Sequence, residues 1–238
     1  MKKSILCIIF ACCNIVFLHA SENQYLGVQV GFTQPITRLN SPISGSETTL
    51  NATVYNGVKV GLVYDATIIK GFGYTMGLNY TFGGGHTPWV RQTTTQPGDY
   101  PKIRTRGQYH QLELLVDWQY KFEIAKDTWL LLYTGPTIQC GLSLSSNGYR
   151  QPNATTEEPT YSKNLYDETS AKDYTLKRIN VTWGIGVGFQ YDRYFIRGGY
   201  DFGLINPYKA QMFEAKNIYT RGRFDQWQIK LGVYFWKK

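Results

Sequence analysis

The sequence predicts an all-β fold, an eight-stranded antiparallel up-and-down transmembrane β-barrel. Three observations predict it: a two-residue alternation of bulky and small side chains, eight segments that carry it, and connections that alternate in length. The clearest segment is 71–82, whose even positions are large and apolar or amphipathic: Phe72, Tyr74, Met76, Leu78, Tyr80 and Phe82. Successive strand side chains point to opposite faces, whereas a helix would mix the two sets. The bulky set is therefore expected to face lipid, and the glycine and polar set a wet lumen.

Charged residues fix the direction of this sorting. In segment 109–122, Glu113, Asp117 and Lys121 share one face, and the opposite face carries six bulky residues. A basic side chain at the middle of a bilayer costs about 2–4 kcal/mol, and an acidic one somewhat less. The charged face must therefore point into the barrel.

Eight strands are expected in order, over residues 24–34, 54–68, 71–82, 109–122, 128–144, 179–191, 194–204 and 226–235. Pro35 is expected to end the first strand, and Pro136 to cause a bulge in the fifth, because proline cannot donate to a ladder. The connections alternate between long polar loops, at 36–53, 83–107, 145–175 and 205–222, and short turns. This layout, with both termini on the short-turn side, is typical of a bacterial outer-membrane barrel.

The first 20 residues read as a signal peptide, because Met1-Lys2-Lys3 precedes a short apolar run and Ala20. The domain prediction is thus a signal peptide over 1–20 and an outer-membrane barrel domain over 21–238. After cleavage Cys140 is the single remaining cysteine, so no intramolecular disulfide or thiol metal site is expected. No cofactor is expected.

The expected location is the outer membrane of a Gram-negative bacterium, with the long loops outside and the termini in the periplasm. Outer-membrane lipid and, during biogenesis, the barrel-assembly machinery are the expected partners, and nucleic acid is not. Aromatic residues make up 16% of the chain, and rings of this kind mark membrane interfaces. The expected girdle on the outward face comprises Tyr80, Trp118, Tyr120, Tyr191, Tyr200, Trp227 and Phe235.

The inward positions carry a set of charged residues: Lys59, Asp65, Glu113, Asp117, Arg197, Asp201 and Lys230. An eight-stranded barrel is only just wide enough for its own side chains, so these charges are expected to form a hydrogen-bonded plug. The preferred members are Arg197, Glu113 and Lys230, and which pairs touch depends on strand register. A narrow gated channel is the alternative.

Two other classes stay open. A lipid-modifying enzyme would need a nucleophile and a base, and His110 lies roughly opposite Cys140 in a count from the short turn. No third orienting group accompanies that pair, and both residues have ordinary roles on an outward face, so the chain is expected not to be an enzyme. A soluble lipocalin-like barrel is the competing fold, and it would require the apolar face to point inward.

Four short motifs resemble the outer-membrane β-barrel domain family of Bacteroidota, which includes PorT-like proteins: Tyr133-Thr134-Gly135-Pro136, the Gly-rich run 184–189, the segment 197–201 and the closing segment 230–235. The resemblance spans nearly the whole mature chain. It implies an eight-stranded outer-membrane barrel. The PorT-like branch is associated with a protein-secretion apparatus, whose proteins would then be partners. No catalytic motif of the family carries over.

Overall fold

Eight long antiparallel strands form the body of the protein in the computed structural model, which describes residues 23–40, 47–49, 55–91, 101–153, 155–167, 175–207 and 221–238. The strands are β1 (Asn23–Asn40), β3 (Asn56–Ile69), β4 (Phe72–His86), β6 (Lys102–Ala125), β7 (Thr128–Gln151), β9 (Ile179–Tyr191), β10 (Tyr194–Gly203) and β11 (Arg221–Lys237). Residues 1–22, which include the expected signal peptide, lie outside the described residues.

The eight strands close into a ring. Sequence neighbours pair around the barrel, and β1 pairs with β11 to complete it. At the seam, Gln24 and Lys238 exchange two backbone hydrogen bonds of 3.2 and 2.9 Å. Each long strand therefore has a partner on both sides. The prediction of an eight-stranded antiparallel up-and-down barrel is confirmed.

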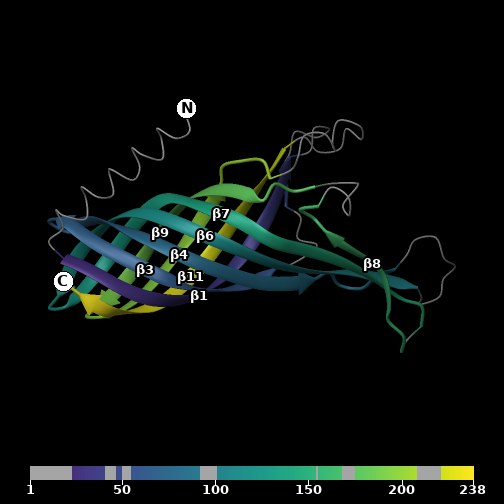
Figure 1. Cartoon of the computed structure of the whole chain (residues 1–238), viewed down its shortest axis with the longest axis horizontal. Coiled ribbons are helices and arrows are strands. Elements are labelled where there is room, and N and C mark those ends of the chain that lie inside the picture. Colours follow the sequence, from purple (N-terminus) through teal and green to yellow (C-terminus); the bar gives the residue numbers. More distant parts are fainter. Residues whose placement is uncertain are drawn as a thin grey trace.

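Two-residue turns join the strands at one end of the barrel, which also holds the C-terminus (Figure 1). Lys70, Gly71, Asp127 and Asp192 have positive φ angles there. Lys70 and Gly71 are both positive, as a tight hairpin turn with strand-compatible twist requires. A Cβ atom on Gly71 would also collide with the backbone carbonyl of Lys121. The turn thus needs glycine for both conformation and space.

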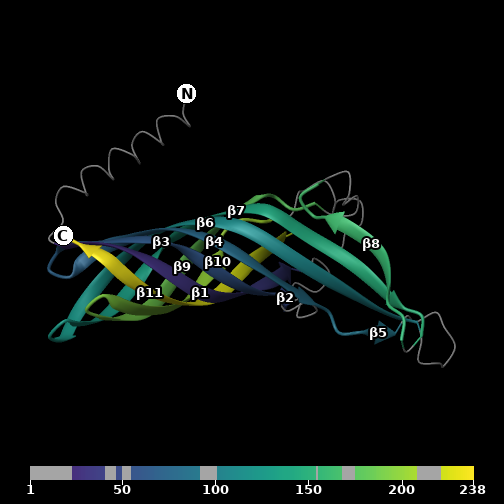
Figure 2. The ribbon, with the colours of Figure 1, turned by 60° about the horizontal axis from the view of Figure 1, so that its bottom comes forward.

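The other end of the barrel carries long connections and three short strands, β2 (Glu47–Thr49), β5 (Val90–Arg91) and β8 (Glu158–Asn164). Strands β6 and β7 continue past the ring, with β5 beside β6 and β8 beside β7 (Figure 2). The loops expected at 83–107 and 145–175 are therefore partly strand. Backbone pairing extends through sequence whose polar composition indicates a loop.

Both proline expectations were wrong. Strand β1 continues past Pro35, which pairs with Gln226 of β11. Pairing of β1 with β3 ends at Thr33, so Pro35 has a strand on one side only, where a missing N–H is tolerated. At Gly135 and Pro136 the pairing of β7 with β6 is interrupted, but the register on either side is unchanged, so there is no bulge. The register shifts between β6 and β7 lie instead at His110/Gln111 and at Glu123/Ala125.

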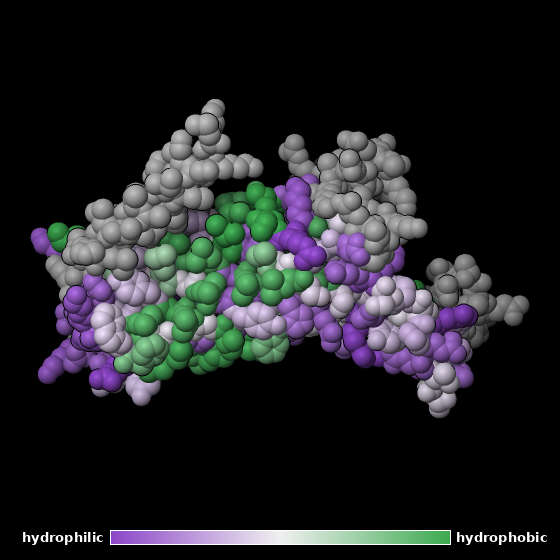
Figure 3. Space-filling model, in the orientation of Figure 1, coloured by the Kyte–Doolittle hydropathy of each residue, from purple (hydrophilic) through white to green (hydrophobic). Residues whose placement is uncertain are grey.

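The barrel has an apolar exterior and a polar interior. Outward leucines at the middle of the strands are about half exposed, as in Leu62 at 54%, Leu78 at 53% and Leu231 at 53%. On the face that Figure 3 shows, hydrophobic residues form a band across the strands, with hydrophilic residues at both ends. Inward-facing residues include buried lysines, arginine, carboxylates and glutamines. The soluble lipocalin-like alternative requires the opposite sorting.

Aromatic side chains fill part of the interior. Tyr25, Phe195 and Tyr234 are buried together, with ring centroids 4.8 Å apart for Phe195 and Tyr234 and 5.1 Å for Tyr25 and Tyr234. Tyr133 is also buried, and it occupies the space that a Cβ atom on the inward-facing Gly186 would need. Small residues on one wall of the lumen thus make room for rings from another.

Candidate functional site

All seven charged residues assigned to the interior lie inside the barrel and are nearly inaccessible to solvent. The exposed fraction does not exceed 4% for any of them: Lys59, Asp65, Glu113, Asp117, Arg197, Asp201 and Lys230. They come from β3, β6, β10 and β11. The two-residue alternation of side chains along each strand places all seven on the inner surface of the barrel. Hydrogen bonds group five of them into two clusters, and Asp117 and Lys230 lie outside both.

The cluster nearer the short turns is centred on Asp65, which is completely buried. Its Oδ1 accepts a hydrogen bond from Lys121 Nζ at 2.7 Å. Its Oδ2 accepts one from Arg197 at 2.7 Å and one from the Tyr234 hydroxyl at 3.0 Å. One carboxylate therefore ties β3, β6, β10 and β11 together. We call these four residues the turn-side cluster.

Neutral polar groups extend the turn-side cluster across the barrel. The Thr75 hydroxyl accepts from Arg197 at 2.9 Å and donates to Gln119 at 2.9 Å. Lys121 also donates to Gln190 at 3.1 Å. Buried charges are tolerated when their remaining hydrogen-bonding positions are filled. These contacts fill several of them, whereas the buried Arg197 Nε has no hydrogen-bond partner among the described residues.

The second cluster lies nearer the long connections and consists of Lys59, Glu113, Asp201, Gln226 and Gln228. Lys59 Nζ donates to Glu113 Oε2 and to Gln228 Oε1, each at 2.7 Å. The Gln228 amide in turn donates to both oxygens of Asp201, and Gln226 donates to Asp201 at 2.7 Å. We call this the loop-side cluster. It spans β3, β6, β10 and β11, like the first.

Asp117 and Lys230 complete the interior set. Neither side chain makes a hydrogen bond to another described residue, although the Lys230 ammonium interacts electrostatically with Asp117 and Asp201. Lys230 Nζ also lies 5.8 Å from the ring centroid of Tyr133. Of the three preferred members, Arg197 pairs with Asp65 and Glu113 with Lys59, so none of the three pairs with another.

The buried interior charges balance. The basic groups are Lys59, Lys121, Arg197 and Lys230, and the acidic groups are Asp65, Glu113, Asp117 and Asp201. Four positive charges thus face four negative charges. A balanced set avoids the cost of an uncompensated buried charge.

Sequence reasoning left Lys121 and Tyr234 out of the network. The two-residue alternation of their strands places both side chains on the inward face. That placement is the sequence feature that could have included them. Their role depends on long-range register: Tyr234 reaches Asp65 across 169 positions of sequence, and Lys121 reaches it across 56.

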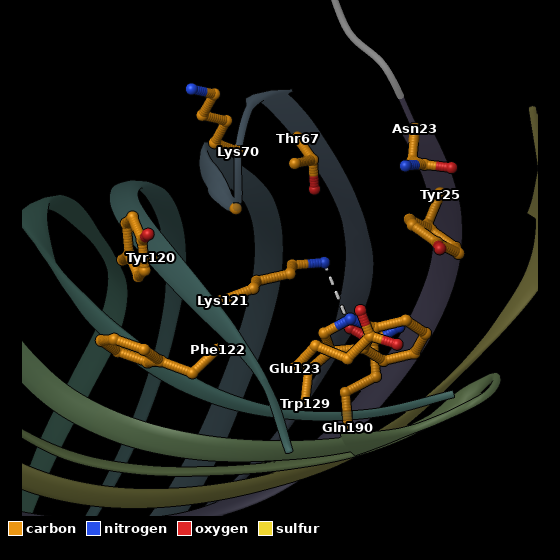
Figure 4. A pocket seen from close by; sticks show the side chains of 11 residues that line it. Asn23, Tyr25, Thr67, Lys70, Tyr120, Lys121, Phe122, Glu123, Trp129 and Gln190 are labelled. Carbon is orange, nitrogen blue, oxygen red and sulfur yellow. Dashed lines mark hydrogen bonds between the residues drawn. The ribbon is translucent and has the colours of Figure 1, made fainter. Parts of the chain in front are cut away.

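A cavity of about 450 Å³ opens at the turn end of the barrel. Figure 4 shows Lys121 extended across it toward Gln190, with Tyr25, Trp129 and Glu123 around the mouth. The Lys121 ammonium also lies 5.0 Å from the ring centroid of Tyr25. Of the turn-side cluster, Lys121 lines this cavity.

The expected girdle residues all point outward. Trp118, Tyr120, Tyr191, Trp227 and Phe235 are exposed, and Tyr80 and Tyr200 are half-buried. The hydroxyl of Tyr80 is 2.7 Å from His110 Nδ1, and the hydroxyl of Tyr200 donates to Asp225 at 2.9 Å. The rings of Trp118 and Trp183 lie in a tilted arrangement, with their centroids 5.8 Å apart.

The expected alignment of His110 with Cys140 was wrong. Cys140 pairs with Leu112, and the irregularity at His110 and Gln111 moves His110 opposite Ser143. The imidazole contacts Tyr80 instead. The described residues hold no cluster of three or more His, Cys, Asp and Glu side chains suited to a metal ion. No helix in the described ranges is long and apolar enough to cross a membrane.

Comparison with solved structures finds similar barrels of low sequence identity. Ail, the attachment invasion locus protein of Yersinia pestis, is 12% identical over 90% of this chain and 99% of that chain, with a TM-score of 0.40. Neisserial surface protein A is 10% identical over 88% and 97%, with a TM-score of 0.39. The N-terminal β-barrel domain of Pseudomonas aeruginosa OprF is 10% identical over 86% and 97%, with a TM-score of 0.25.

No protein-family model and no curated protein matches the chain. At the identities and TM-scores above, the likeness to solved barrels carries no functional information. Function is therefore inferred from this chain's own residues.

Proposed function

We propose that this chain is an outer-membrane β-barrel protein with a structural or assembly role. The long connections would face the exterior, the turns and termini the periplasm, and residues 1–20 would be a signal peptide. One observation carries the proposal: leucines such as Leu78 are exposed on the outside while Lys59 and Arg197 are about 1% exposed inside. That sorting is unfavourable in water and favourable in a bilayer.

The height of the apolar band supports the same proposal. On β4 the outward rings Phe72 and Phe82 are ten residues apart. At about 3.4 Å per residue this is roughly 34 Å along the strand, or about 26 Å in depth for a tilt near 40°. Outer-membrane barrels have an apolar band about 25 Å tall.

We propose further that the interior network closes the lumen. The two clusters form successive layers across a barrel whose width suits its own side chains. Their balanced charges and mutual hydrogen bonds favour a fixed plug over a conducting path. A narrow channel is the alternative, and it would need both layers to rearrange.

The membrane proposal is tested by fractionation and by gel mobility. We expect the protein in detergent-extracted outer membrane, and a shift in mobility between unheated and boiled samples, because a folded barrel resists denaturation by detergent. Recovery in the soluble fraction without detergent, with no heat-dependent shift, would contradict the proposal.

A second candidate is an accessory of a protein-secretion apparatus, as the PorT-like resemblance implies. The specific observation in its favour is the sheet of β5, β6, β7 and β8 that extends past the ring, where it could meet a partner. Crosslinking in native outer membrane followed by mass spectrometry tests it. A stoichiometric partner crosslinked to residues 102–108 or 145–151 supports the accessory role, and a barrel recovered without partners argues against it.

We propose no catalytic role for His110 and Cys140. Their separation in register and the contact of His110 with Tyr80 support a non-enzymatic protein.

A further inference from the structure

The cavity at the turn end of the barrel has the size and lining of a ligand site. Its volume of about 450 Å³ is enclosed by residues of β1, β3, β6, β7 and β9 and of the turn between β3 and β4. Small-molecule pockets are typically about 300–1,000 Å³ in volume, and they combine aromatic rings with a few polar groups. The cavity in Figure 4 has this combination. It therefore suits a small organic molecule.

Lys121 brings a positive charge to the cavity, although its side chain is only 5% exposed. An ammonium group has three N–H donors. Within the described residues, Asp65 accepts from one of them at 2.7 Å and Gln190 from another at 3.1 Å. The third donor is available to an acceptor that enters the cavity.

The neighbours of Lys121 hold it in one position. Its backbone N–H donates to the carbonyl of Gly71 at 2.8 Å, in the turn where Gly71 has a positive φ angle. Gln190, which accepts from the ammonium, donates its own amide N–H to the carbonyl of Asp192 at 3.0 Å. A site that is ordered before it binds loses less conformational freedom on binding. The ammonium is therefore preorganised for a ligand.

Two aromatic rings give the cavity an apolar wall. Tyr25 is 5% exposed, and its ring packs at 5.1 Å between centroids against that of Tyr234. Trp129 is half-buried and lines the same cavity. Aromatic side chains offer a large contact area. The apolar part of a ligand could thus pack on these rings while a polar group reaches Lys121.

The charges at the cavity favour an anionic ligand. Lys70 and Lys121 line it, whereas Glu123 is the acidic residue in its lining. The carboxylate of Asp65, which pairs with Lys121, also pairs with Arg197. One anion is therefore shared between two cations below the cavity. A concave site with more cationic than anionic groups attracts anions.

We propose that this cavity binds a small organic carboxylate. The carboxylate accepts a hydrogen bond from the Lys121 ammonium, and an attached apolar or aromatic group packs against Tyr25 and Trp129. Hydrogen bonds between two charged groups are roughly twice as strong as neutral ones. The inference goes beyond the proposed structural role. Delivery of the ligand from the periplasm is the one part that rests on the proposed outer-membrane location.

Calorimetric titration of the folded full chain in phosphatidylcholine nanodiscs tests the proposal, with N-acetyl-L-phenylalanine as the probe. Its amide, N-acetyl-L-phenylalaninamide, keeps the ring without the charge, and acetate keeps the charge without the ring. We expect saturable binding of the acid, with a Kd at least about tenfold lower than for the amide or acetate, because either analogue loses one set of contacts. No binding of the acid, or equal binding of inorganic phosphate, would overturn the proposal.

The variant Lys70→Asn/Trp129→Ala removes one ammonium and one ring from the cavity and leaves the turn-side cluster intact. Asn tolerates the positive φ angle at position 70. We expect it to bind the acid about tenfold more weakly than the wild type does. The matched control, Lys126→Asn/Trp89→Ala, removes the same side chains outside the cavity and should bind as the wild type does. Equal weakening by both variants would overturn the site.

The variant Lys121→Met tests the ammonium itself, since a ligating ammonium is what distinguishes the acid from the amide. We expect this variant to bind the two probes with similar Kd values. A retained preference for the acid would overturn the role of Lys121.

Heat-dependent gel mobility is measured on every variant, so that loss of folding is detected separately. If Lys121→Met does not fold, the Lys70→Asn/Trp129→Ala variant and its control decide the outcome. A wild type that shifts with heat and does not bind the acid would overturn the cavity site alone. A wild type without the heat shift would contradict the membrane location instead.

Discussion

Asp65 is the residue on which the interior network depends most, because its carboxylate binds both Lys121 and Arg197. Removing one partner of a buried ion pair leaves an uncompensated charge, which typically costs about 3–5 kcal/mol. Here two cations would lose their anion at once. The turn-side cluster is therefore expected to contribute strongly to stability.

Replacement Asp65→Asn keeps the shape of the side chain and removes its charge. We expect the free energy of unfolding, measured by denaturant titration in lipid vesicles, to fall by about 3–5 kcal/mol. Asp127→Asn, at an exposed turn position where Asn tolerates the positive φ, is the control and should change it little. Equal stability of the two variants would show that Asp65 is not structurally important.

At the residue scale, the sequence alone could predict which side of the wall a residue occupies and not which residue it meets. The two-residue period placed Arg197 and Glu113 inside. Their actual partners, Asp65 and Lys59, follow from the relative stagger of eight strands, which no local pattern encodes. Lys121 had the correct parity and was omitted from the network for the same reason.

Among the elements, the strands carry opposite chemistry on their two faces, and β4 does so most clearly. Leu78 lies at the middle of its outward face, whereas Ile69 lies on β3 beside a turn. A charge on the lipid-facing surface costs about 2–4 kcal/mol at the bilayer centre and about 0–1 kcal/mol near the interface. The position of a substituted residue along its strand should therefore decide how much a new charge lowers the free energy of unfolding.

We expect Leu78→Arg to lower the free energy of unfolding in vesicles by about 2–4 kcal/mol, and Ile69→Arg by less than about 1 kcal/mol. Equilibrium denaturation of both variants in the same lipid measures this. If the two substitutions cost the same, the depth assigned to β4 is incorrect.

Strand ends were harder to predict than strands. The bounds of β9 match the expected 179–191, because Ile179 and Tyr191 end a strict alternation beside clear turn residues. Strands β1 and β7 run further than expected, to Asn40 and Gln151. Cross-strand hydrogen bonding extends them through polar sequence, which composition alone assigns to loops.

For the whole molecule, two layers of charged side chains lie one after the other along a narrow barrel. We therefore expect each layer to close the lumen by itself. Emptying one layer should leave the other in place. In planar bilayers we expect no stable conductance from the wild type or from Lys59→Ala/Glu113→Ala, which removes the ion pair of the loop-side cluster.

Conductance should appear when Asp65→Ala, Lys121→Ala and Arg197→Ala are added to that variant. Each variant is first checked for its heat-dependent mobility shift. Steady conductance from the wild type would contradict the proposed plug and favour the narrow channel.

The most direct test of the proposed membrane barrel is the environment of alternate residues along β4. In a Cys140→Ala background, single cysteines at Thr75, Met76, Gly77, Leu78 and Asn79 would carry a spin label in reconstituted bilayers. Collision rates with oxygen, which concentrates in lipid, are compared with those of a water-soluble nickel complex. We predict high oxygen exposure at Met76 and Leu78 and low exposure at the three positions that face the interior. The reverse pattern, or high exposure of Met76 and Leu78 to the nickel complex, would contradict a lipid-facing apolar surface.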